Sequence, residues 1–481
     1  MLTEFISDHR LDLDAIFNRY AEKTAMAGPG FSLTYPELKI RILTAAAQLK
    51  AHSGRQGMRI GLYAENPAMY PILMQAVWQI EAVFIPLDVK APLEHHFSII
   101  TPDLLITDQP VPEDNRIPII HPDQLTVASP AEMKNASQLL PLNLEAEASV
   151  ILTSGSSGTP KGVVHTIGNY FYSAWGTIDY LSLTFADSWL VSLPLFHIGG
   201  LLICIRTLLS GALAILPENS RELESPIKAY QPSILSLVPT QLLRFLEKPE
   251  MTLLLKQSRG ILLGGAAAPE WLIRKAFRQG VPVLPTYGST ESCAQATGVG
   301  LHSSEADRLT SGKALRFRSV RLDRDQNIII GGQTIFKHYL TRDGIPEPRP
   351  EREFKTSDIG RFDASGNLVV LGRSDQIFQS GGENINPFEI ETALADLEGI
   401  TAVVVVPVSH PEFGQVPWAF VQTVEPLKVE QIKQALKKQL PAYKIPKEIY
   451  QMPLDSRINA MKPDRKKLAE IAAQLQKTES R

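Results

Sequence analysis

A short loop rich in glycine and hydroxyl residues is the part of the sequence best suited to bind phosphate. Residues 150–164 read VILTSGSSGTPKGVV, in which a β-branched run enters the loop and KGVV leaves it. Small residues let backbone N–H groups approach an anion, and hydroxyl groups add rotatable donors. Lys161 adds a positive charge. We therefore predict that a triphosphate is held by Thr153, Ser154, Gly155, Ser156, Ser157, Gly158, Thr159 and Lys161.

This loop is not a P-loop of the Walker type. The pattern GxxxxGK[ST], started at Gly155, requires glycine at 160 and serine or threonine at 162. The chain has Pro160 and Gly162 there, and strand-like residues follow where a helix should begin. A flexible surface loop is the alternative, but two buried-type strands around the loop favour a binding site.

Alternating strands and helices frame the loop. The runs MRIGLYAEN, AVFIPLDV and DLLITD are short, apolar and end in small or polar residues, which is typical of buried strands. Helical patterns lie between them at 35–52 and 70–80, and the same alternation returns over 188–298. This order predicts an α/β core with mainly parallel sheets.

The pattern changes after about residue 312. Strand-like pieces with turn signals predict an all-β, barrel-like segment, and residues 382–397 then enter an amphipathic helix. Two strands, the helical run VEQIKQALKKQL and a loop before Lys462 follow. We expect a large N-terminal domain of α/β subdomains plus a β-barrel-like subdomain over 1–374, and a small mobile α+β domain over 375–481.

Composition and charge exclude several classes of protein. With 44% hydrophobic and 21% charged residues in 481, the chain is neither disordered nor collagen-like. Cys204 and Cys293 are its only cysteines, so a disulfide framework is excluded and a reducing compartment fits. The start MLTEFISDHR lacks the features of a signal peptide, and the longest apolar stretch, 201–216, is short for a bilayer. We expect a cytoplasmic protein without a membrane span.

The charge is unevenly distributed. The whole chain has a net charge of -3, but residues 425–481 hold 13 Lys+Arg against 7 Asp+Glu. Such a segment is typical of one that faces a polyanion, or of a solvated lysine-rich helix, and both interpretations stay open. No nucleic acid partner is expected, because no zinc-ligand spacing or RNA-binding motif accompanies the charge.

The loop and six further segments resemble, in order, the motifs of the adenylate-forming superfamily of acyl- and aryl-CoA synthetases, firefly-luciferase-like enzymes and peptide-synthetase adenylation domains. After TSGSSGTPKG come LPLFHIGG (193–200), LLGGAAAPE (262–270), TYGSTES (286–292), TSDIG (356–360), GRSDQIFQSGGENINPFEIE (372–391) and NAMKPDRKKL (459–468). Ser357 stands where the family has glycine. The resemblance covers essentially the whole chain.

The resemblance implies how ATP and Mg²⁺ are held. The loop would bind the β- and γ-phosphates, and Glu291 would bind Mg²⁺ with Thr153 nearby, since a carboxylate suits this ion. Asp358 would accept hydrogen bonds from the ribose, assisted by Arg373. The other implied nucleotide-binding residues are Gly265, Ala266, Ala267, Tyr287, Gly288 and Thr290. Taken without the family, Glu291 is a solvated residue after a turn and Tyr287 a core residue.

Lys462 and His197 are implied, with Glu291, as catalytic residues. Lys462 would contact the carboxylate and the α-phosphate while the acyl-adenylate forms. Its spacing departs from the family, because it comes nine residues after Pro453 instead of six, and Lys466 and Lys467 are the alternatives. A histidine flanked by apolar residues is more often a core residue, whereas the resemblance implies that His197 is a gate between the acyl and thiol channels.

The resemblance also implies parts for the C-terminal domain. Asp375 would be the hinge about which this domain rotates between two half-reactions, although Gln376 departs from the acidic residue that is common next to it. Gly381, Gly382 and Glu383 would lie at the CoA tunnel. The basic end of the chain would then face the phosphates of CoA.

The acid pocket is implied to include His197, Gly264, Gly288 and Arg206. LPLFHIGG lacks the aspartate that amino-acid adenylation domains use, which disfavours an amino acid. The motifs most resemble those of o-succinylbenzoate-CoA ligases of menaquinone biosynthesis, which carry a basic residue nine positions after the histidine, here Arg206. An arginine among aliphatic residues must find an anion or reach water. A second substrate carboxylate, a structural ion pair and a helix-surface position stay open for it.

We therefore predict an ATP-dependent acid–thiol ligase. It would activate a carboxylic acid as an acyl-adenylate, release pyrophosphate, transfer the acyl group to CoA and release AMP, with o-succinylbenzoate as the expected acid. The alternatives are a medium- or long-chain fatty acyl-CoA ligase, another aryl-CoA ligase, or an acyl-AMP ligase that loads a carrier protein. ATP, CoA and the acid are the expected partners, with Mg²⁺, and a homodimer stays open.

Overall fold

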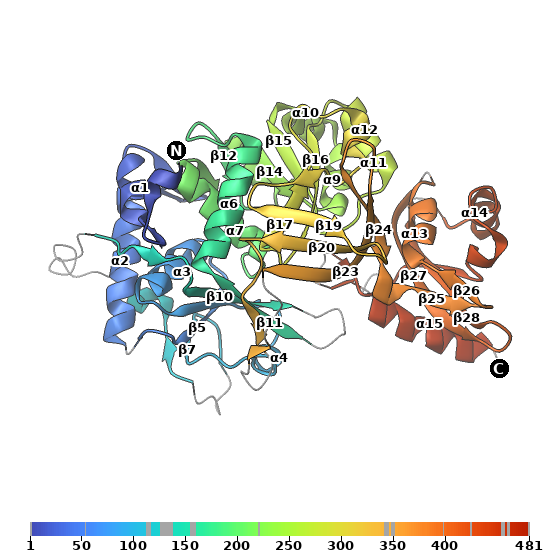
Figure 1. Cartoon of the computed structure of the whole chain (residues 1–481), viewed down its shortest axis with the longest axis horizontal. Coiled ribbons are helices and arrows are strands. Elements are labelled where there is room, and N and C mark those ends of the chain that lie inside the picture. Colours follow the sequence, from blue (N-terminus) through green and yellow to red (C-terminus); the bar gives the residue numbers. More distant parts are fainter. Residues whose placement is uncertain are drawn as a thin grey trace.

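Two large sheets and the helices between them form the N-terminal part of the molecule, and a small α+β unit follows them (Figure 1). This arrangement is seen in a computed structural model. The structure describes residues 2–52, 54–111, 117–125, 138–153, 160–219, 222–340, 346–347, 352–397, 399–423, 426–453, 457–458 and 462–479.

The first sheet carries the glycine-rich loop. Its order is β22-β21-β11-β10-β6-β5-β7-β8. β10 is parallel to β6 and antiparallel to β11, with Thr153 opposite Lys161, so both ends of the loop are fixed in one sheet. The strands are β5 (Arg59–Tyr63), β6 (Val83–Pro86), β7 (Leu104–Thr107), β8 (Ile119–Ile120), β10 (Glu147–Thr153), β11 (Lys161–Thr166), β21 (His338–Leu340) and β22 (Pro346–Glu347).

The second sheet has the order β18-β17-β16-β15-β14-β12-β13-β3-β4, and its central strands are parallel. Apolar runs with both faces covered form these strands, as is typical of parallel sheets. The strands are β3 (Thr24–Gly28), β4 (Phe31–Thr34), β12 (Ser188–Leu190), β13 (Leu213–Ile215), β14 (Ile234–Leu237), β15 (Gly260–Leu263), β16 (Val283–Ser289), β17 (Ala294–Gly298) and β18 (Lys313–Ala314).

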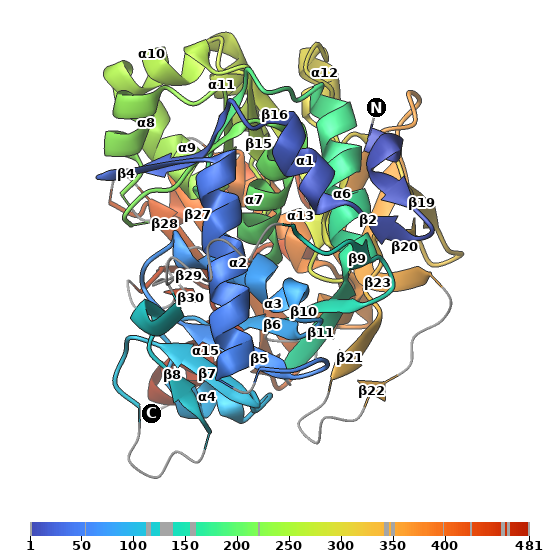
Figure 2. The ribbon, with the colours of Figure 1, turned by 90° about the vertical axis from the view of Figure 1, so that its left-hand side faces the viewer.

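Helices fill the space between and around these sheets. α7 is buried over nearly its whole length in the largest apolar cluster, which explains why its sequence is apolar all round. α2 covers the outer side of the N-terminal half (Figure 2) and starts at a capping box between Thr34 and Glu37. The helices before residue 310 are α1 (Leu13–Arg19), α2 (Tyr35–Ala51), α3 (Met69–Gln79), α4 (Leu93–Phe97), α6 (Ile167–Leu181), α7 (Ile198–Ser210), α8 (Glu224–Tyr230), α9 (Pro239–Leu246), α10 (Pro249–Gln257), α11 (Glu270–Arg278) and α12 (Glu305–Arg308).

The predicted all-β segment is an antiparallel sheet of order β19-β20-β23-β24. Its strands are β19 (Arg318–Leu322), β20 (Asn327–Gly332), β23 (Glu353–Phe362) and β24 (Leu368–Arg373). β24 leads directly into the C-terminal unit, and Asn386 Nδ2 donates to the Leu371 carbonyl at 2.8 Å. The first residues of that unit therefore pack on the end of this sheet.

The C-terminal unit has a mainly antiparallel sheet of order β26-β25-β28-β27, with β29 added in parallel to β28. Leu468 and Ala472 of α15 pack into the apolar cluster of Trp418, while Lys466 and Lys477 are exposed. The elements are β25 (Phe378–Ser380), β26 (Glu383–Ile385), α13 (Pro387–Ala395), β27 (Ile400–His410), β28 (Gly414–Thr423), α14 (Val429–Leu436), β29 (Ile449–Gln451), β30 (Arg457–Ile458), β31 (Lys462–Pro463) and α15 (Arg465–Glu479).

One predicted helix is shorter than expected. The run VEQIKQALKKQL predicts a helix through residue 440, but α14 ends at Leu436. Pro441 follows the run, and proline disfavours the helical conformation in the residue before it. The loop predicted before Lys462 lies partly outside the described residues, and Lys462 itself starts β31, which pairs with β30.

A buried carboxylate fixes the amino-terminal ends of three parallel strands. Both Asp187 oxygens accept from Arg259, each at 2.9 Å, and Oδ1 also accepts from the Ser233 hydroxyl at 3.0 Å. These residues precede or begin β12, β14 and β15. The three strands are thereby aligned, so that their carboxyl ends lie along the same edge of the sheet.

Asp187→Ala is expected to destabilise the protein by about 2–3 kcal/mol, because Arg259 loses charge-assisted hydrogen bonds in a mostly buried place. Urea denaturation measures the change. The control is Arg321→Ala, which removes the exposed ion pair with Glu353 and is expected to cost less than about 1 kcal/mol. Equal losses in the two variants would contradict this account of Asp187.

Candidate active site

The carboxyl ends of parallel strands bring several predicted residues to one edge of the second sheet. β12, β14, β15 and β16 are parallel neighbours. His197 follows β12, residues 264–267 follow β15, and β16 carries Tyr287 and leads to Glu291. Open α/β sheets bind their ligands at this edge. The sequence motifs, which are far apart along the chain, therefore meet where a ligand is expected.

Asp358 joins this edge to the antiparallel sheet. The Tyr287 hydroxyl donates to Asp358 Oδ2 at 2.6 Å, and Arg373 Nη1 donates to Asp358 Oδ1 at 3.3 Å. Arg373 also donates to both oxygens of Asp375, at 2.9 and 2.6 Å. Burial, and then the charge of Asp358, raise the pKa of Tyr287, so this hydroxyl stays protonated as a donor. The structure brings all four predicted residues into one network.

Glu291 is held by a residue that the sequence analysis did not single out. The Tyr339 hydroxyl donates to Glu291 Oε1 at 3.0 Å, and the Phe336 N–H donates to the Glu291 carbonyl at 2.9 Å. The Lys161 ammonium lies 4.7 Å from the centre of the Tyr339 ring. Tyr339 therefore connects the carboxylate predicted to bind a metal with the lysine of the glycine-rich loop.

The side chains near Glu291 fit Mg²⁺ better than a metal held entirely by protein. Among the described residues, no group of three or more His, Cys, Asp or Glu side chains could hold a metal ion. Mg²⁺ typically takes one or two carboxylates and completes its shell with phosphate oxygens and water. Glu291 offers one such carboxylate, and Thr153 lies at the end of β10, where the loop begins.

His165 supports the same segment from behind. Its Nε2–H donates to the Thr290 carbonyl at 2.8 Å, and Nδ1 is buried without a partner. Burial lowers the pKa of His165 to about 4. Shortly after Thr290 and Glu291 in the chain, Cys293 and Ala294 have φ of 55° and 70°, an uncommon conformation for residues with a Cβ. The turn that presents Glu291 is thus strained and held in place by a neutral histidine.

His197 and Arg206 lie on the same helix but in different surroundings. His197 is the N-cap of α7 and is partly exposed, with the Phe196 ring 4.4 Å away. Arg206 is 3% exposed, its Nε and Nη2 have no partner, and its guanidinium lies 5.3 Å from the Trp189 ring centre. The helix-surface alternative for Arg206 is therefore wrong, because α7 is buried on all sides. No ion pair of Arg206 occurs among the described residues either.

Other predicted residues are placed without such contacts. Residues 265–267 are exposed after β15, next to partly exposed Gly264, and Gly288 is exposed on β16. Gly381 and Gly382, with φ of 59° and 88°, form the two-residue turn between β25 and β26, and Glu383 follows it on β26. Positive φ at both turn positions is typical of a type I′ hairpin, which glycine adopts readily. This hairpin is exposed on the C-terminal unit.

Two predicted parts lie outside what the structure describes. Residues 154–159, the middle of the loop, are among them, and so is the side chain of Lys462, whose backbone alone is placed in β31. For these residues the roles implied by the family resemblance stay predictions.

Sequence patterns gave no signal for Tyr339, His165 and Arg318. Each is a single polar residue in or beside an apolar run, where it looks like an ordinary strand residue. Their partners lie 48 or more positions away, at Glu291, Thr290 and Ser173. The one local signal near any of these partners is the motif TYGSTES, which contains Thr290 and Glu291.

The geometry agrees with comparisons to known proteins. The model of the AMP-binding enzyme family matches residues 13–340, and that of the AMP-binding enzyme C-terminal domain matches residues 389–457. The chain belongs to the AMP-binding enzyme family. The predicted superfamily, fold class and enzymatic nature are thereby confirmed, whereas a domain boundary at 374/375 stays a prediction.

Three similar proteins or structures within this family are described as o-succinylbenzoate–CoA ligases or synthetases. The chain is 30% identical over 435 residues to the 2-succinylbenzoate–CoA ligase of Listeria monocytogenes serotype 4b, covering 89% of this chain and 92% of that protein. It is 27% identical to o-succinylbenzoate CoA synthetase of Bacillus subtilis in complex with the acyl-adenylate intermediate, with a TM-score of 0.80 and coverage of 94% and 97%. The same synthetase in complex with ATP and magnesium ion also gives 27% and 0.80, with coverage of 94% and 98%.

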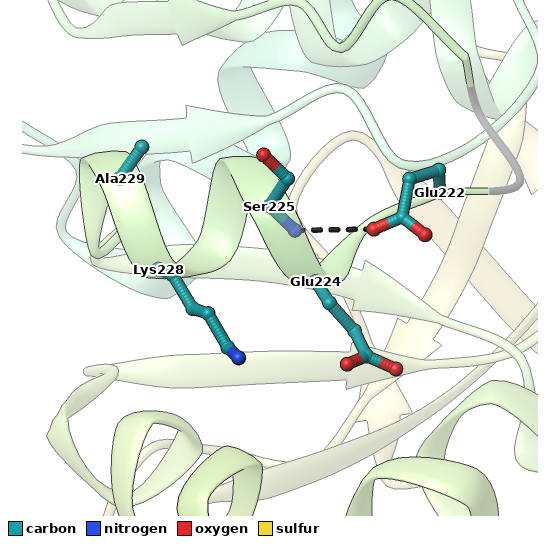
Figure 3. A pocket seen from close by; sticks show the side chains of 5 residues that line it. All are labelled: Glu222, Glu224, Ser225, Lys228 and Ala229. Carbon is teal, nitrogen blue, oxygen red and sulfur yellow. Dashed lines mark hydrogen bonds between the residues drawn. The ribbon is translucent and has the colours of Figure 1, made fainter.

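A separate hollow on the surface does not belong to this site. It lies over α8 and is lined by Glu222, Glu224, Ser225, Lys228 and Ala229 (Figure 3). Lys228 pairs with Glu250 and Glu224 pairs with Lys248, so its charges are already compensated. Within the described part of the chain, none of the helices is long and apolar enough to cross a membrane.

Replacing His165 by glutamine is expected to reduce the loss of stability in acid. Below pH 6.5 the unfolded chain takes up a proton at this histidine, but the folded protein, with a pKa of about 4, does not. Folding stability therefore falls as the pH drops from 6.5 towards 4, by about 2 kcal/mol at pH 5. Urea denaturation at pH 7 and pH 5 measures the difference.

The control for this experiment is His302→Gln, at an exposed histidine. It should leave the acid loss of the wild type unchanged. If His165→Gln also loses as much stability on acidification as the wild type, the buried neutral state of His165 is disproved.

Proposed function

We propose that the protein is an AMP-forming acid–thiol ligase that joins o-succinylbenzoate to coenzyme A. A carboxylate oxygen of the acid attacks the α-phosphorus of ATP, the bond to pyrophosphate breaks, and an acyl-adenylate forms. The CoA thiol, as thiolate, then attacks the acyl carbon, and AMP leaves. The small-molecule partners are thus ATP, CoA and the acid, with no nucleic acid, and the proposed place of action is the cytoplasm.

The observation that carries this proposal is the convergence of the Tyr287–Asp358–Arg373 network, Glu291 and His197 at one sheet edge. A nucleotide needs hydrogen-bond acceptors for its ribose and cations or a metal for its phosphates. Asp358 supplies the first, and the loop with Lys161 supplies the second. The relatives that hold an acyl-adenylate, or ATP and magnesium ion, support the same assignment.

Each side chain at this edge has a proposed task. Asp358 accepts hydrogen bonds from the ribose hydroxyls, and Tyr287 and residues 265–267 bracket the adenine. Thr290 and Gly288 complete the nucleotide site, and Gly264 and Gly288 also line the acid pocket. Mg²⁺, when bound at Glu291 and Thr153, would offset phosphate charge. His197 separates the acid from the thiol. Lys462 stabilises the negative charge that develops while the α-phosphate is attacked.

The C-terminal unit is proposed to serve both half-reactions. Asp375 lies in the short 3-10 turn Ser374–Gln376 between the end of β24 and the C-terminal unit, which is a suitable place for a hinge. Rotation about this hinge would move the segment of Lys462 away from the active site. The hairpin of Gly381, Gly382 and Glu383 would take its place there. The exposed lysines of α15 would meet the phosphates of CoA.

The choice of acid rests on Arg206. A guanidinium that is almost fully buried, with two nitrogens lacking partners, requires an anion from outside the protein. The second carboxylate of o-succinylbenzoate supplies it. A fatty acid would leave the charge unpaired, and sites with buried unpaired polar groups reject such substrates strongly.

The test is consumption of CoA and formation of AMP with a panel of acids. We expect kcat/KM for o-succinylbenzoate to exceed that for octanoate by about 100-fold or more. Arg206→Met should lower the value for o-succinylbenzoate by about 100-fold and leave octanoate unchanged, whereas the control Arg244→Met, at an exposed position of α9, should change neither.

The other outcomes decide between functions. Pyrophosphate exchange without CoA consumption would indicate an acyl-AMP ligase that loads a carrier protein. A preference for octanoate that Arg206→Met does not alter would indicate a fatty acyl-CoA ligase. If no acid gives AMP, the proposed activity is wrong.

Lys462→Ala is expected to separate the two half-reactions. Formation of the adenylate should slow by about 100- to 1,000-fold, because the charge that stabilises the transition state is lost. Transfer to CoA from chemically prepared acyl-adenylate should change less than about threefold. Single-turnover release of pyrophosphate and of AMP measures the two steps, and a matching loss in Lys466→Ala instead would move the role to that residue.

A further inference from the structure

A second arginine, Arg318, is buried against α6. It is the first residue of β19 and is 8% exposed. Its Nη2 donates to the Ser173 carbonyl and hydroxyl, at 3.1 and 2.8 Å, and Nη1 donates to the Arg316 carbonyl at 3.1 Å. Its Nε has no partner. Neutral oxygens thus accept hydrogen bonds from two of the three guanidinium nitrogens, but they do not neutralise its positive charge.

Arg318 is held by Ser173 of α6, and α6 packs against α7, the helix of Arg206, while both helices contact β17, which begins directly after Cys293. Ser173 of α6, which binds Arg318, also donates its hydroxyl to the Cys293 carbonyl at 2.6 Å. Burial raises the pKa of the Cys293 thiol to about 12, and the charges of Arg318 and Arg206 both counteract this. Burial, and then the charge of Arg206, lower the pKa of Arg318 to about 9. Cys293 therefore lies within electrostatic reach of both guanidinium groups.

Neither arginine has a carboxylate partner among the described residues. The ion pairs found there include neither Arg206 nor Arg318, and no carboxylate contributes to the pKa of either. Between them the two side chains leave three buried N–H-bearing nitrogens without an acceptor. Two cations close together in a low-dielectric interior are costly unless an anion joins them. Donors without acceptors are the complement of a carboxylate, which has only acceptors.

We propose that Arg318 is a second specificity-determining residue of the acid pocket, and that it and Arg206 together bind the carboxylate of the substrate that is not activated. This inference rests on the proposed function, in which the acid enters next to α7. It identifies the preferred substrate class as acids with a second, fully ionised carboxylate remote from the reacting one. A substrate with a neutral group in that place leaves both Arg206 and Arg318 unpaired. It is therefore disfavoured more strongly than it would be by Arg206 alone.

Neighbouring Arg316 provides a matched comparison. It lies two residues earlier on the same segment, and its side chain is 52% exposed and within 3.9 Å of Asp179. Its guanidinium lies 5.0 Å from the Trp175 ring centre. A substitution there alters charge and packing close to Arg318 but removes no buried donor.

The experiment compares o-succinylbenzoate with two analogues in which a methyl group replaces one carboxylate: 2-butanoylbenzoate keeps the aryl carboxylate, and 4-(2-methylphenyl)-4-oxobutanoate keeps the aliphatic one. The analogue that the wild type converts retains the reacting carboxylate and lacks the other. Arg318→Met is expected to raise KM for o-succinylbenzoate by about 10- to 100-fold, with kcat changed less than about threefold, and to leave KM for the converted analogue unchanged. Arg316→Met should behave as the wild type with both acids.

A second measurement does not depend on turnover. Without the acid, the thermal midpoint of Arg318→Met is the reference, because the variant loses the hydrogen bonds to Ser173 and Arg316 as well as an unpaired buried charge. The stabilisation by saturating o-succinylbenzoate should be smaller in this variant than in the wild type. Arg318→Lys, which keeps the charge but loses the planar donors, should show an intermediate KM and decides the question if the methionine variant does not fold.

The outcomes separate this inference from the function on which it rests. If the wild type turns over none of these acids, the proposed function fails and the inference fails with it. Suppose the wild type uses o-succinylbenzoate. If Arg318→Met and Arg318→Lys then have the KM of the wild type, or if their KM rises by the same factor with both acids, only the inference is overturned. A loss confined to the dicarboxylic acid supports it.

Discussion

The parallel alignment of β12, β14, β15 and β16 is the constraint on which the site depends. In a parallel sheet every strand ends at the same edge, so the segments that follow these strands must come together whatever their separation in the chain. Asp187 and Arg259 fix the other ends of three of these strands. Because the strands are held at their starting ends, the positions of His197, Tyr287 and Glu291 are set relative to one another by the backbone. The side chains of these residues can therefore contact a ligand at this edge without being long.

Three side-chain contacts carry this arrangement into the rest of the molecule. Tyr287 joins the edge to the antiparallel sheet through Asp358, and Tyr339 joins it to the first sheet through Glu291. His165, from the same first sheet, supports the turn in between. Each of the three sheets thus contributes to one place. The elements proposed to hold a nucleotide are separate in the fold but are connected by hydrogen bonds from two tyrosines and a histidine.

Much of this could be predicted from the sequence, for physical reasons that also mark the limits. Strands such as β5 and β7 are continuous apolar runs, and α2 starts at a capping box, so local composition was sufficient for them. The motifs around Tyr287 and Asp358 predicted a shared site. Contacts such as those of Tyr339 and Arg318 depend instead on which strands lie next to each other, as β21 does to β11, and no local pattern records that. The apolar spacing of residues 429–440 alone predicts a helix to residue 440, whereas α14 ends at Leu436, ahead of Pro441.

Arg373 is the last residue of β24 and shares its donors between Asp358 and Asp375. One planar guanidinium with five donors binds two carboxylates at once in a fixed geometry, whereas the three donors of a lysine ammonium lack the planar arrangement that binds a carboxylate through both oxygens. With the roles proposed above for Asp358 at the ribose and Asp375 at the hinge, nucleotide binding and movement of the C-terminal unit are therefore linked through Arg373. A change at position 373 made to tune one of them alters the other as well, and the two can be engineered separately only by substitutions at the carboxylates.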